Sequence, residues 1–165
     1  MLRRIAVVLL ALALPVAAHA AATVGGGPMF GPRFGMSVDP DQVVLGGQFT
    51  TAELAPRVTF DPNLEIGLGD HETIVALNMD GHYHLTLHDS DWSPYVGFGV
   101  GINFISIDEP APVEDQSDTA VGGNIILGTT VPTRSASLFF AEMKLGLGDG
   151  PSLKILAGWN FALRR

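Results

Sequence analysis

The sequence contains no cysteine among its 165 residues. Disulfides therefore cannot stabilise the fold, and thiolate metal sites and thiol nucleophiles are excluded. Basic residues are also scarce, with nine Lys and Arg against seventeen Asp and Glu. Because binding to nucleic-acid phosphates needs clustered Lys and Arg, we do not expect nucleic acid as a partner.

Patterns that would indicate helices or a nucleotide site are missing as well. After the first twenty residues, no stretch is apolar over the roughly 18 residues that a transmembrane helix requires, and no segment has a helical repeat of apolar residues. Gly97, Gly99 and Gly101 alternate with larger residues, a spacing that differs from a phosphate-binding turn between a strand and a helix. These absences leave strands as the expected elements.

The first twenty residues have the layout of a secretory signal peptide. Arg3 and Arg4 precede an apolar run from Ile5 to Leu14, and Ala18-His19-Ala20 forms a small-residue cleavage site. The run is too short to cross a bilayer. We therefore expect export and cleavage after Ala20. The predicted division of the chain is a signal peptide over 1–20, a flexible leader over 21–28 and one β-barrel domain over 29–165.

The part of the chain from Thr73 to Phe104 shows the pattern on which the fold prediction depends. Every second residue is apolar in two segments, and the residues between them are polar or glycine. A repeat of two places the two sets on opposite faces of a strand. One face of each strand is therefore apolar and the other is polar.

The same alternation recurs along the whole mature chain and predicts an all-β fold with an even number of strands. Turn-forming residues separate the alternating segments. The predicted strands cover residues 29–38, 42–51, 57–69, 73–88, 95–104, 121–131, 137–147 and 152–161, and the longest connection is a surface loop over 108–119.

Pro62 leaves two possibilities for the third segment. Proline cannot donate a hydrogen bond to a neighbouring strand, so Asp61-Pro62-Asn63 could be a turn that divides the segment. The alternation continues unbroken across Pro62, which favours a single strand.

Alternation alone does not distinguish a soluble barrel or sandwich from a membrane barrel. In a soluble barrel the nine Phe and two Trp residues would crowd an interior that has room for little beyond the side chains of about eight strands. A membrane barrel reverses the faces, with a polar lumen and an apolar surface. We therefore predict an eight-stranded antiparallel up-and-down transmembrane β-barrel with a polar, side-chain-filled lumen.

Charged residues on the polar face support this prediction because their signs balance. A buried charge is costly unless it is paired, and four basic residues on this face oppose four acidic ones. We predict that these residues, together with two histidines, form an ion-pair network in the lumen. The network consists of Arg33, Arg57, Asp61, Glu65, Asp80, His82, His84, Glu142, Lys144 and Lys154.

The apolar face supplies the residues that we expect to contact lipid. They alternate with the lumen residues in the fourth, fifth, seventh and eighth segments. The predicted lipid-facing residues are Leu77, Val96, Phe98, Val100, Ile102, Phe104, Leu145, Trp159 and Phe161.

Two segments in particular resemble a known family. Pro94–Phe104 and Leu153–Phe161, together with the signal sequence, resemble the small eight-stranded outer-membrane β-barrel proteins of Gram-negative-type bacteria, the group that includes the outer membrane protein A barrel domain. The resemblance extends over the whole mature chain and consists of loose patterns of alternation. It implies an outer-membrane location, with outer-membrane lipids, lipopolysaccharide and the barrel assembly machinery as partners. We expect a monomer.

Most of the remaining acidic residues lie in the connections that would face the cell exterior. This acidic rim could recruit divalent cations that bridge to lipopolysaccharide phosphates, although simple solvation explains it as well. Its members are Asp39, Asp41, Asp70, Glu72, Asp108, Glu109, Glu114, Asp115, Asp118 and Asp149.

The histidines of the fourth segment were considered as metal ligands. His82, His84 and His88 share one face with Asp80, but neighbours on a face lie about 6.5 to 7 Å apart along a strand. A metal site would need convergent ligands from other strands. We therefore expect no metal and no cofactor, and assign these histidines to interior hydrogen bonding.

Some relatives of this size are lipid A deacylases or acyltransferases that use a His and a Ser. His88 with Ser90 or Ser93 and Asp91 is the local set that resembles such a site, but a turn explains Asp89-Ser90-Asp91 equally well. We predict no catalytic residues and a structural or interaction role in the envelope. A barrel that binds a small ligand or forms a narrow pore is the alternative, and a lipid A modifying enzyme is a weaker one.

Overall fold

The computed structural model describes residues 27–87, 90–107, 116–133 and 137–163. These residues form eight strands and no helix. The strands are β1 (Met29–Val38), β2 (Gln42–Thr50), β3 (Val58–Leu68), β4 (Glu72–His84), β5 (Ser93–Ile107), β6 (Gln116–Pro132), β7 (Ser137–Gly148) and β8 (Leu153–Ala162).

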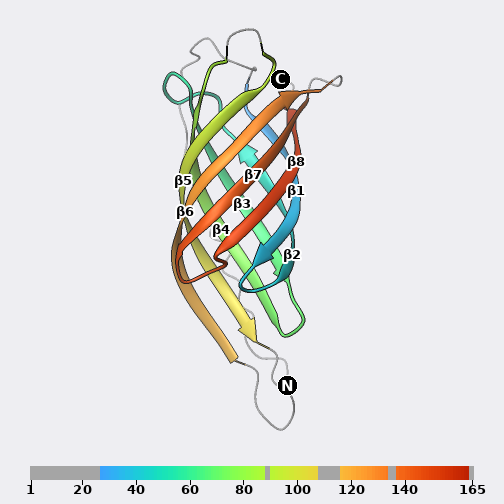
Figure 1. Ribbon diagram of the computed structural model, residues 1–165, viewed down its shortest axis with the longest axis vertical. Coiled ribbons are helices and arrows are strands. Elements are labelled where there is room, and N and C mark those ends of the chain that lie inside the picture. The colour runs from blue at the N-terminus through green and yellow to red at the C-terminus, as the bar shows by residue number, and fades with distance from the viewer. Residues whose placement is uncertain (1–26, 88–89, 108–115, 134–136, 164–165) are drawn as a thin grey trace.

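The eight strands form one closed antiparallel barrel in which each strand pairs with its neighbours in the chain. Closure is made by β1 and β8, whose pairing runs from Met29 opposite Ala162 to Val38 opposite Leu153. Figure 1 shows the strands tilted steeply around an elongated barrel. The predicted eight-stranded up-and-down barrel is confirmed, and closure satisfies the edges that an open sheet would expose.

The barrel has two distinct ends. At the terminal end the chain enters β1 and leaves β8, and the backbone N–H of Leu163 donates to the carbonyl of Pro28 at 3.1 Å. The β2–β3, β4–β5 and β6–β7 connections also lie there. The distal end carries the other four connections, and β5 and β6 extend farther there than their neighbours (Figure 1).

Except at the start of β6, side chains alternate between the interior and the outer surface. In β1, for example, Arg33 and Ser37 are buried, whereas Phe34, Met36 and Val38 are exposed. Most of the buried polar and charged residues of the protein lie on the inner face, and most of the large exposed apolar residues lie on the outer face. The predicted partition of polar and apolar faces therefore describes the barrel.

Three predicted strand boundaries were wrong by three or more residues, and one of them is the end of the fifth strand, which continues from Phe104 to Ile107. The fourth strand ends at His84 instead of His88, and Leu85 to Leu87 lie outside it. The sixth begins at Gln116, so the end of the predicted surface loop over 108–119 belongs to a strand. There the backbone pairs with the end of β5, although Gln116 to Thr119 are all exposed and their sequence carries no alternation.

Pro62 does not divide the third strand. β3 is continuous from Val58 to Leu68, and Pro62 pairs with Met79 of β4. On its other side the ladder to β2 runs as far as Gln48 opposite Asn63 and resumes where Thr51 N–H donates to the carbonyl of Phe60. Pro62 has no N–H to donate to β2, and the hydrogen-bond ladder between β2 and β3 is interrupted at this position.

Within the described residues, no helix has the length and apolar character needed to cross a membrane. The predicted signal peptide over 1–20 lies outside the described residues, as does the leader over 21–28 except for Gly27 and Pro28.

Candidate functional site

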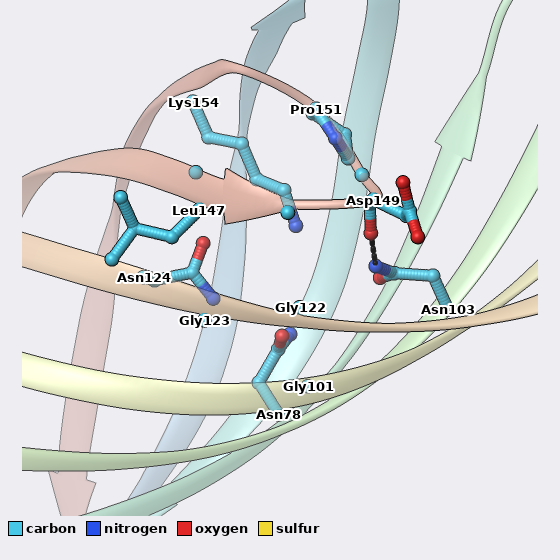
Figure 2. A pocket seen from close by; sticks show the side chains of 13 residues that line it. Asn78, Gly101, Asn103, Gly122, Gly123, Asn124, Leu147, Asp149, Pro151 and Lys154 are labelled. Atoms are coloured by element: carbon cyan, nitrogen blue, oxygen red, sulfur yellow. Dashed lines mark hydrogen bonds between the residues drawn. The ribbon is translucent and has the colours of Figure 1, made fainter.

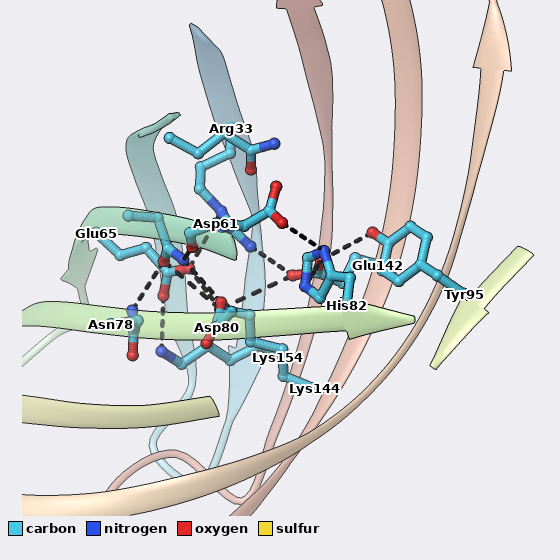
Figure 3. Close-up of polar contacts among 12 residues, drawn as sticks. Arg33, Asp61, Glu65, Asn78, Asp80, His82, Tyr95, Glu142, Lys144 and Lys154 are labelled. Atoms are coloured by element: carbon cyan, nitrogen blue, oxygen red, sulfur yellow. Dashed lines mark hydrogen bonds and ion pairs between the residues drawn. The ribbon is translucent and has the colours of Figure 1, made fainter. Parts of the chain in front are cut away.

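The centre of the barrel is filled by six charged side chains that we call the central network. They come from five strands and are almost completely buried. Figure 3 shows them meeting across the lumen. The central network consists of Arg33 of β1, Glu65 of β3, Asp80 of β4, Glu142 and Lys144 of β7 and Lys154 of β8.

Lys144 is the cation with the most carboxylate contacts in the central network. Its Nζ lies 2.6 Å from Asp80 Oδ2, 3.4 Å from Glu65 Oε1 and 3.8 Å from Glu142 Oε1. Its side chain is inaccessible to solvent. Such a charge is tolerated in a low-dielectric interior only when opposite charges compensate it.

Arg33 and Lys154 complete the pairing. Arg33 Nη2 donates to Glu142 Oε1 at 2.5 Å, and Arg33 Nε lies 3.1 Å from Glu65 Oε1. Lys154 Nζ donates to Glu65 Oε2 at 2.7 Å. Each carboxylate of the central network therefore has at least one Lys or Arg partner.

Three neutral residues that the sequence analysis did not single out extend the central network. Asn63 donates to Asp80 Oδ2 at 2.7 Å and accepts from Asn78 at 2.9 Å. The hydroxyl of Tyr95 donates to Glu142 Oε2 at 2.8 Å. All three share the polar face in the sequence, which is the one signal that pointed to them.

Arg57, predicted to be a lumen cation, lies outside the interior, and this prediction was wrong. It is exposed at the terminal end, just before β3, with a φ of 66° in the left-handed region. Its carbonyl accepts a hydrogen bond from His84 N–H. The chain turns at Arg57, so the alternation that holds inside β3 does not apply to it. The described interior therefore has three fixed cations against four carboxylates.

The fourth carboxylate, Asp61, lies at the terminal side of the central network. Its Oδ1 accepts from Thr50 at 2.5 Å and its Oδ2 from Thr59 at 2.6 Å. His82 Nδ1 lies 3.2 Å from Oδ2. No Lys or Arg among the described residues forms an ion pair with Asp61. It is held by two hydroxyls and one imidazole.

The histidines lie next to Tyr95. The ring of His82 stacks on Tyr95 with 4.5 Å between centroids, and His84 lies 5.4 Å from the same ring. His84 Nε2 is 3.2 Å from Thr59 Oγ1, and His84 Nδ1 is 3.5 Å from Ser93 Oγ. His82 is buried and His84 is half-buried. His88, the third predicted member of this face, lies outside the described residues.

Two cavities flank the central network. The terminal cavity, of about 190 Å³, is bounded on its inner side by Asp61, His82, Tyr95 and Phe140. The distal cavity has only about 10 Å³ and lies among Asn78, Asn103, Asn124 and Lys154. Figure 2 shows the amide of Asn103 donating to the carbonyl of Asp149 beside it. The distal cavity has room for about one water molecule.

Apolar side chains also enter the interior. Ile126, Phe140 and Leu156 are almost fully buried there, and Arg33 lies over the ring of Phe140 at 5.8 Å. The sequence analysis predicted a polar lumen, and Ile126 interrupts its polar face. These residues fill space that the charged side chains leave.

The described residues contain no group of three or more His, Asp or Glu side chains that could hold a metal ion. Of the His–Ser set that was weighed as a catalytic site, His88 lies outside the described residues, and Ser90 and Asp91 are exposed. The histidine that does lie near Ser93 is His84. No local sequence pattern pairs these two residues, because His84 belongs to β4 and Ser93 to β5.

The outer surface is apolar along the middle of the barrel. Each predicted lipid-facing residue is 37 to 57% exposed, which is high for side chains of this kind. Trp159 packs against Phe34 and Phe139, with ring centroids 5.9 and 5.3 Å apart. The predicted residues on this surface are Leu77, Val96, Phe98, Val100, Ile102, Phe104, Leu145, Trp159 and Phe161.

No protein-family model matches the chain, and no curated protein matches it. Solved structures with a similar fold do exist. The N-terminal β-barrel domain of Pseudomonas aeruginosa OprF has a TM-score of 0.67 at 16% identity, over 83% of this chain and 98% of that domain. Neisserial surface protein A (NspA) has a TM-score of 0.62 at 11% identity, over 82% and 96%.

A de novo designed protein, TMB2.3, has a TM-score of 0.53 at 14% identity, over 86% of this chain and 98% of that chain. At these identities the similarity establishes the fold alone. The chain has the fold of the small eight-stranded outer-membrane β-barrels.

Proposed function

We propose that the protein is a structural β-barrel of a bacterial outer membrane. It has a closed lumen and no catalytic activity, and it contributes to the envelope or to interactions at its surface. The observation that carries this proposal is the reversed partition of side chains. Buried charges occupy the interior, and a continuous belt of exposed Phe, Leu, Ile and Val covers the outside.

The outer belt supports a lipid environment. Monomeric soluble proteins rarely expose contiguous apolar patches larger than a few hundred Å², whereas this belt follows all eight strands. The strands contain 9 to 17 residues, which meets the roughly 9 to 11 that a tilted strand needs to cross a bilayer. A closed barrel leaves no unpaired strand edge in the lipid.

We further infer that the terminal end faces the periplasm, as the resemblance to small outer-membrane barrels implies. The distal end, with Asp39, Asp41, Asp70 and Asp149 in its connections, then faces the exterior. Outer-membrane lipids, lipopolysaccharide and the assembly machinery are the partners that this placement implies, and we propose a monomer.

The central network supports a closed lumen. Arg33, Glu142 and Lys144 are at most 4% exposed and link β1 to β7 across the interior. An ion passing through would have to separate these paired charges in a low-dielectric environment, which is costly. The distal cavity beyond them holds about one water, so it provides no continuous path.

Single-channel recording tests the closed lumen. Purified protein reconstituted in planar bilayers is expected to give no stable conductance steps. A Lys144→Ala variant that is folded by gel mobility serves as the comparison, because it removes part of the plug. Reproducible conductance steps from the wild-type protein would contradict the proposal and favour a narrow pore.

The absence of catalysis has its own test. The His84 and Ser93 side chains face the interior at the terminal end, whereas a lipid A modifying enzyme needs its nucleophile at the membrane surface. We expect the mass spectrum of lipid A to be the same in cells with and without the protein. A change in acyl chain number that disappears in a Ser93→Ala variant would identify an enzyme instead.

A further inference from the structure

The fixed charges in the described part of the interior do not balance. Three fixed cations compensate Glu65, Asp80 and Glu142 within the central network. Asp61 is buried to the same degree, at 3% exposure, but its ion-pair partner among the described residues is His82 alone. An interior carboxylate without a fixed positive charge is costly to bury, so this site lacks one cation.

The Asp61 carboxylate lies beside a cavity. The terminal cavity, of about 190 Å³, has Asp61 in its wall. Three of its lining residues are acidic, namely Glu53, Asp61 and Asp91, and none is Lys or Arg. A cation entering from the terminal end would therefore meet negative groups first at the rim and then at the floor.

The wall is arranged to receive a hydrogen-bonding group. Thr50 and Thr59 fix the orientation of the Asp61 carboxylate through bonds of 2.5 and 2.6 Å. These donors carry no charge, so among the described residues His82 alone could compensate the negative charge of Asp61. The buried Nε2 of His82 has no hydrogen-bond partner among the described residues, and the nearest carboxylate oxygen, Glu142 Oε2, is 3.7 Å away. With the Nδ1–H of His82 directed at Asp61, its Nε2 is an acceptor, so a ligand that carries several N–H donors would satisfy both groups.

The lining also distinguishes the kind of cation. No three His, Asp or Glu side chains of the described residues converge closely enough to hold a metal ion. The rings of Tyr95 and Phe140, together with Met29 and Leu138, form part of the wall, and a partly apolar lining suits the carbon atoms of an organic cation. The volume of about 190 Å³ is many times that of the distal cavity, which has room for about one water molecule, so the terminal cavity can admit a small solute.

We propose that the terminal cavity binds a small organic cation, a primary ammonium or guanidinium compound, whose charge is paired with Asp61. The proposal rests on the proposed function only through the placement of the terminal end in the periplasm, from which such a solute would enter. Binding to the purified barrel does not depend on that placement. A failure of one proposal is therefore distinguishable from a failure of the other.

Nuclear magnetic resonance titration of the folded barrel in detergent micelles tests the site. The probes are methylguanidinium, the neutral amide acetamide and the anion acetate. Methylguanidinium is expected to shift the ring signals of His82 and His84 saturably with one-to-one stoichiometry, and acetamide and acetate are not. Equal responses to all three probes, or no saturable response to methylguanidinium, would overturn the proposal.

Variants locate the binding. Asp61→Asn keeps the shape and one of the two acceptor oxygens, and we expect it to weaken methylguanidinium binding about tenfold or more, equivalent to about 1.4 kcal/mol. The double variant Glu53→Gln with Asp91→Asn leaves the interior intact and is expected to weaken binding to a smaller extent. Asp41→Asn at the distal end is the matched control and is expected to bind as the wild type does.

Unchanged binding in both terminal-end variants would overturn the proposal, as would saturable zinc binding without any methylguanidinium response. Protonated His82 would supply the same charge from within the fold. His82 faces Asp61, Glu142 and the Tyr95 ring, with His84 nearby. Repeating the titration at higher pH removes the competing proton, and binding that weakens as pH rises would contradict the assignment.

Discussion

At the scale of single residues, Lys144 has the strongest structural constraint in the barrel. It is completely buried and lies within 4 Å of three carboxylates. The carboxylates of Glu65, Asp80 and Glu142 would repel one another without it. Removing one partner of a buried ion pair is costly mainly because it leaves the other charge buried without compensation.

Replacing Lys144 with Met therefore tests the central network. Met preserves most of the aliphatic volume and removes the charge. Leaving the buried carboxylates without this partner is expected to lower the free energy of unfolding by about 3 to 5 kcal/mol. Reversible urea unfolding in detergent micelles measures the change.

Arg57→Met is the matched control, because it removes a cation from the exposed rim. A change within about 0.5 kcal/mol is expected there. If Arg57→Met were as damaging as Lys144→Met, Arg57 would belong to the interior network after all.

A second residue, Val100, tests the outer belt. It is about half exposed on β5, adjacent in sequence to Gly99, which pairs with Asp80 of the central network. Val100→Arg is expected to cost about 2 to 4 kcal/mol if it lies near the bilayer midplane. Folding into lipid vesicles, followed by urea titration, measures this cost.

The matched control for Val100→Arg is Val43→Arg. Val43 is equally exposed on the outer face but lies at the distal end of β2. The cost there is expected to be about 0 to 1 kcal/mol. Equal and small effects at both positions would indicate that the outer belt contacts water instead of lipid.

Residue-level reasoning from the sequence identified faces but not partners. Asp80 and Lys144 were assigned to the lumen because alternation fixes the face of a strand residue. Their contact depends on the register between β4 and β7, which are not adjacent in the barrel, and no local pattern encodes it. Arg57 was misassigned for a different reason, since a turn residue with positive φ breaks the period of two.

At the scale of strands, the sequence predicted the number of strands better than the residues at which they begin and end. Seven of the eight predicted strands start within about two residues of the observed strand, because turn-forming residues precede them in the sequence. β6 starts five residues earlier than predicted. Its first residues, from Gln116 to Thr119, are held by pairing with β5 and are exposed throughout. Because the side chains of these residues are exposed, their sequence has no alternation of apolar and polar residues from which the strand could be predicted.

Closure of the barrel depends on close approach between β1 and β8. A methyl group on Gly31 would overlap the backbone carbonyl oxygen of Trp159. Gly31→Ala is therefore expected to force the two strands apart and to destabilise the barrel by about 1 to 3 kcal/mol. Gel mobility before and after heating, together with urea unfolding, measures the effect.

Gly47→Ala is the control for closure, because the nearest atom to its added methyl group, the Gly31 carbonyl oxygen, is 3.8 Å away. That variant is expected to be neutral or slightly stabilised. Equal destabilisation by the two variants would show that the loss comes from glycine as such and not from the β1–β8 approach.

At the scale of the whole molecule, the two ends of the barrel differ in both charge and access. The terminal end opens into a cavity that reaches Asp61, whereas the distal end is closed above the central network by Asn78, Asn103 and Asn124. Of the two cavities lined by described residues, the terminal one has room for a solute larger than water. The orientation of the barrel in the membrane decides which compartment supplies such a solute.

The absence of cysteine makes this orientation directly measurable. Ala55→Cys places a single thiol at the terminal end, and Asp70→Cys places one at the distal end; both positions are exposed. With a membrane-impermeant maleimide, intact cells are expected to label only the Asp70→Cys variant, and both variants after the outer membrane is permeabilised. The wild-type protein gives the background. Labelling of the Ala55→Cys variant alone in intact cells would reverse the orientation, and the terminal cavity would then draw its ligand from the exterior.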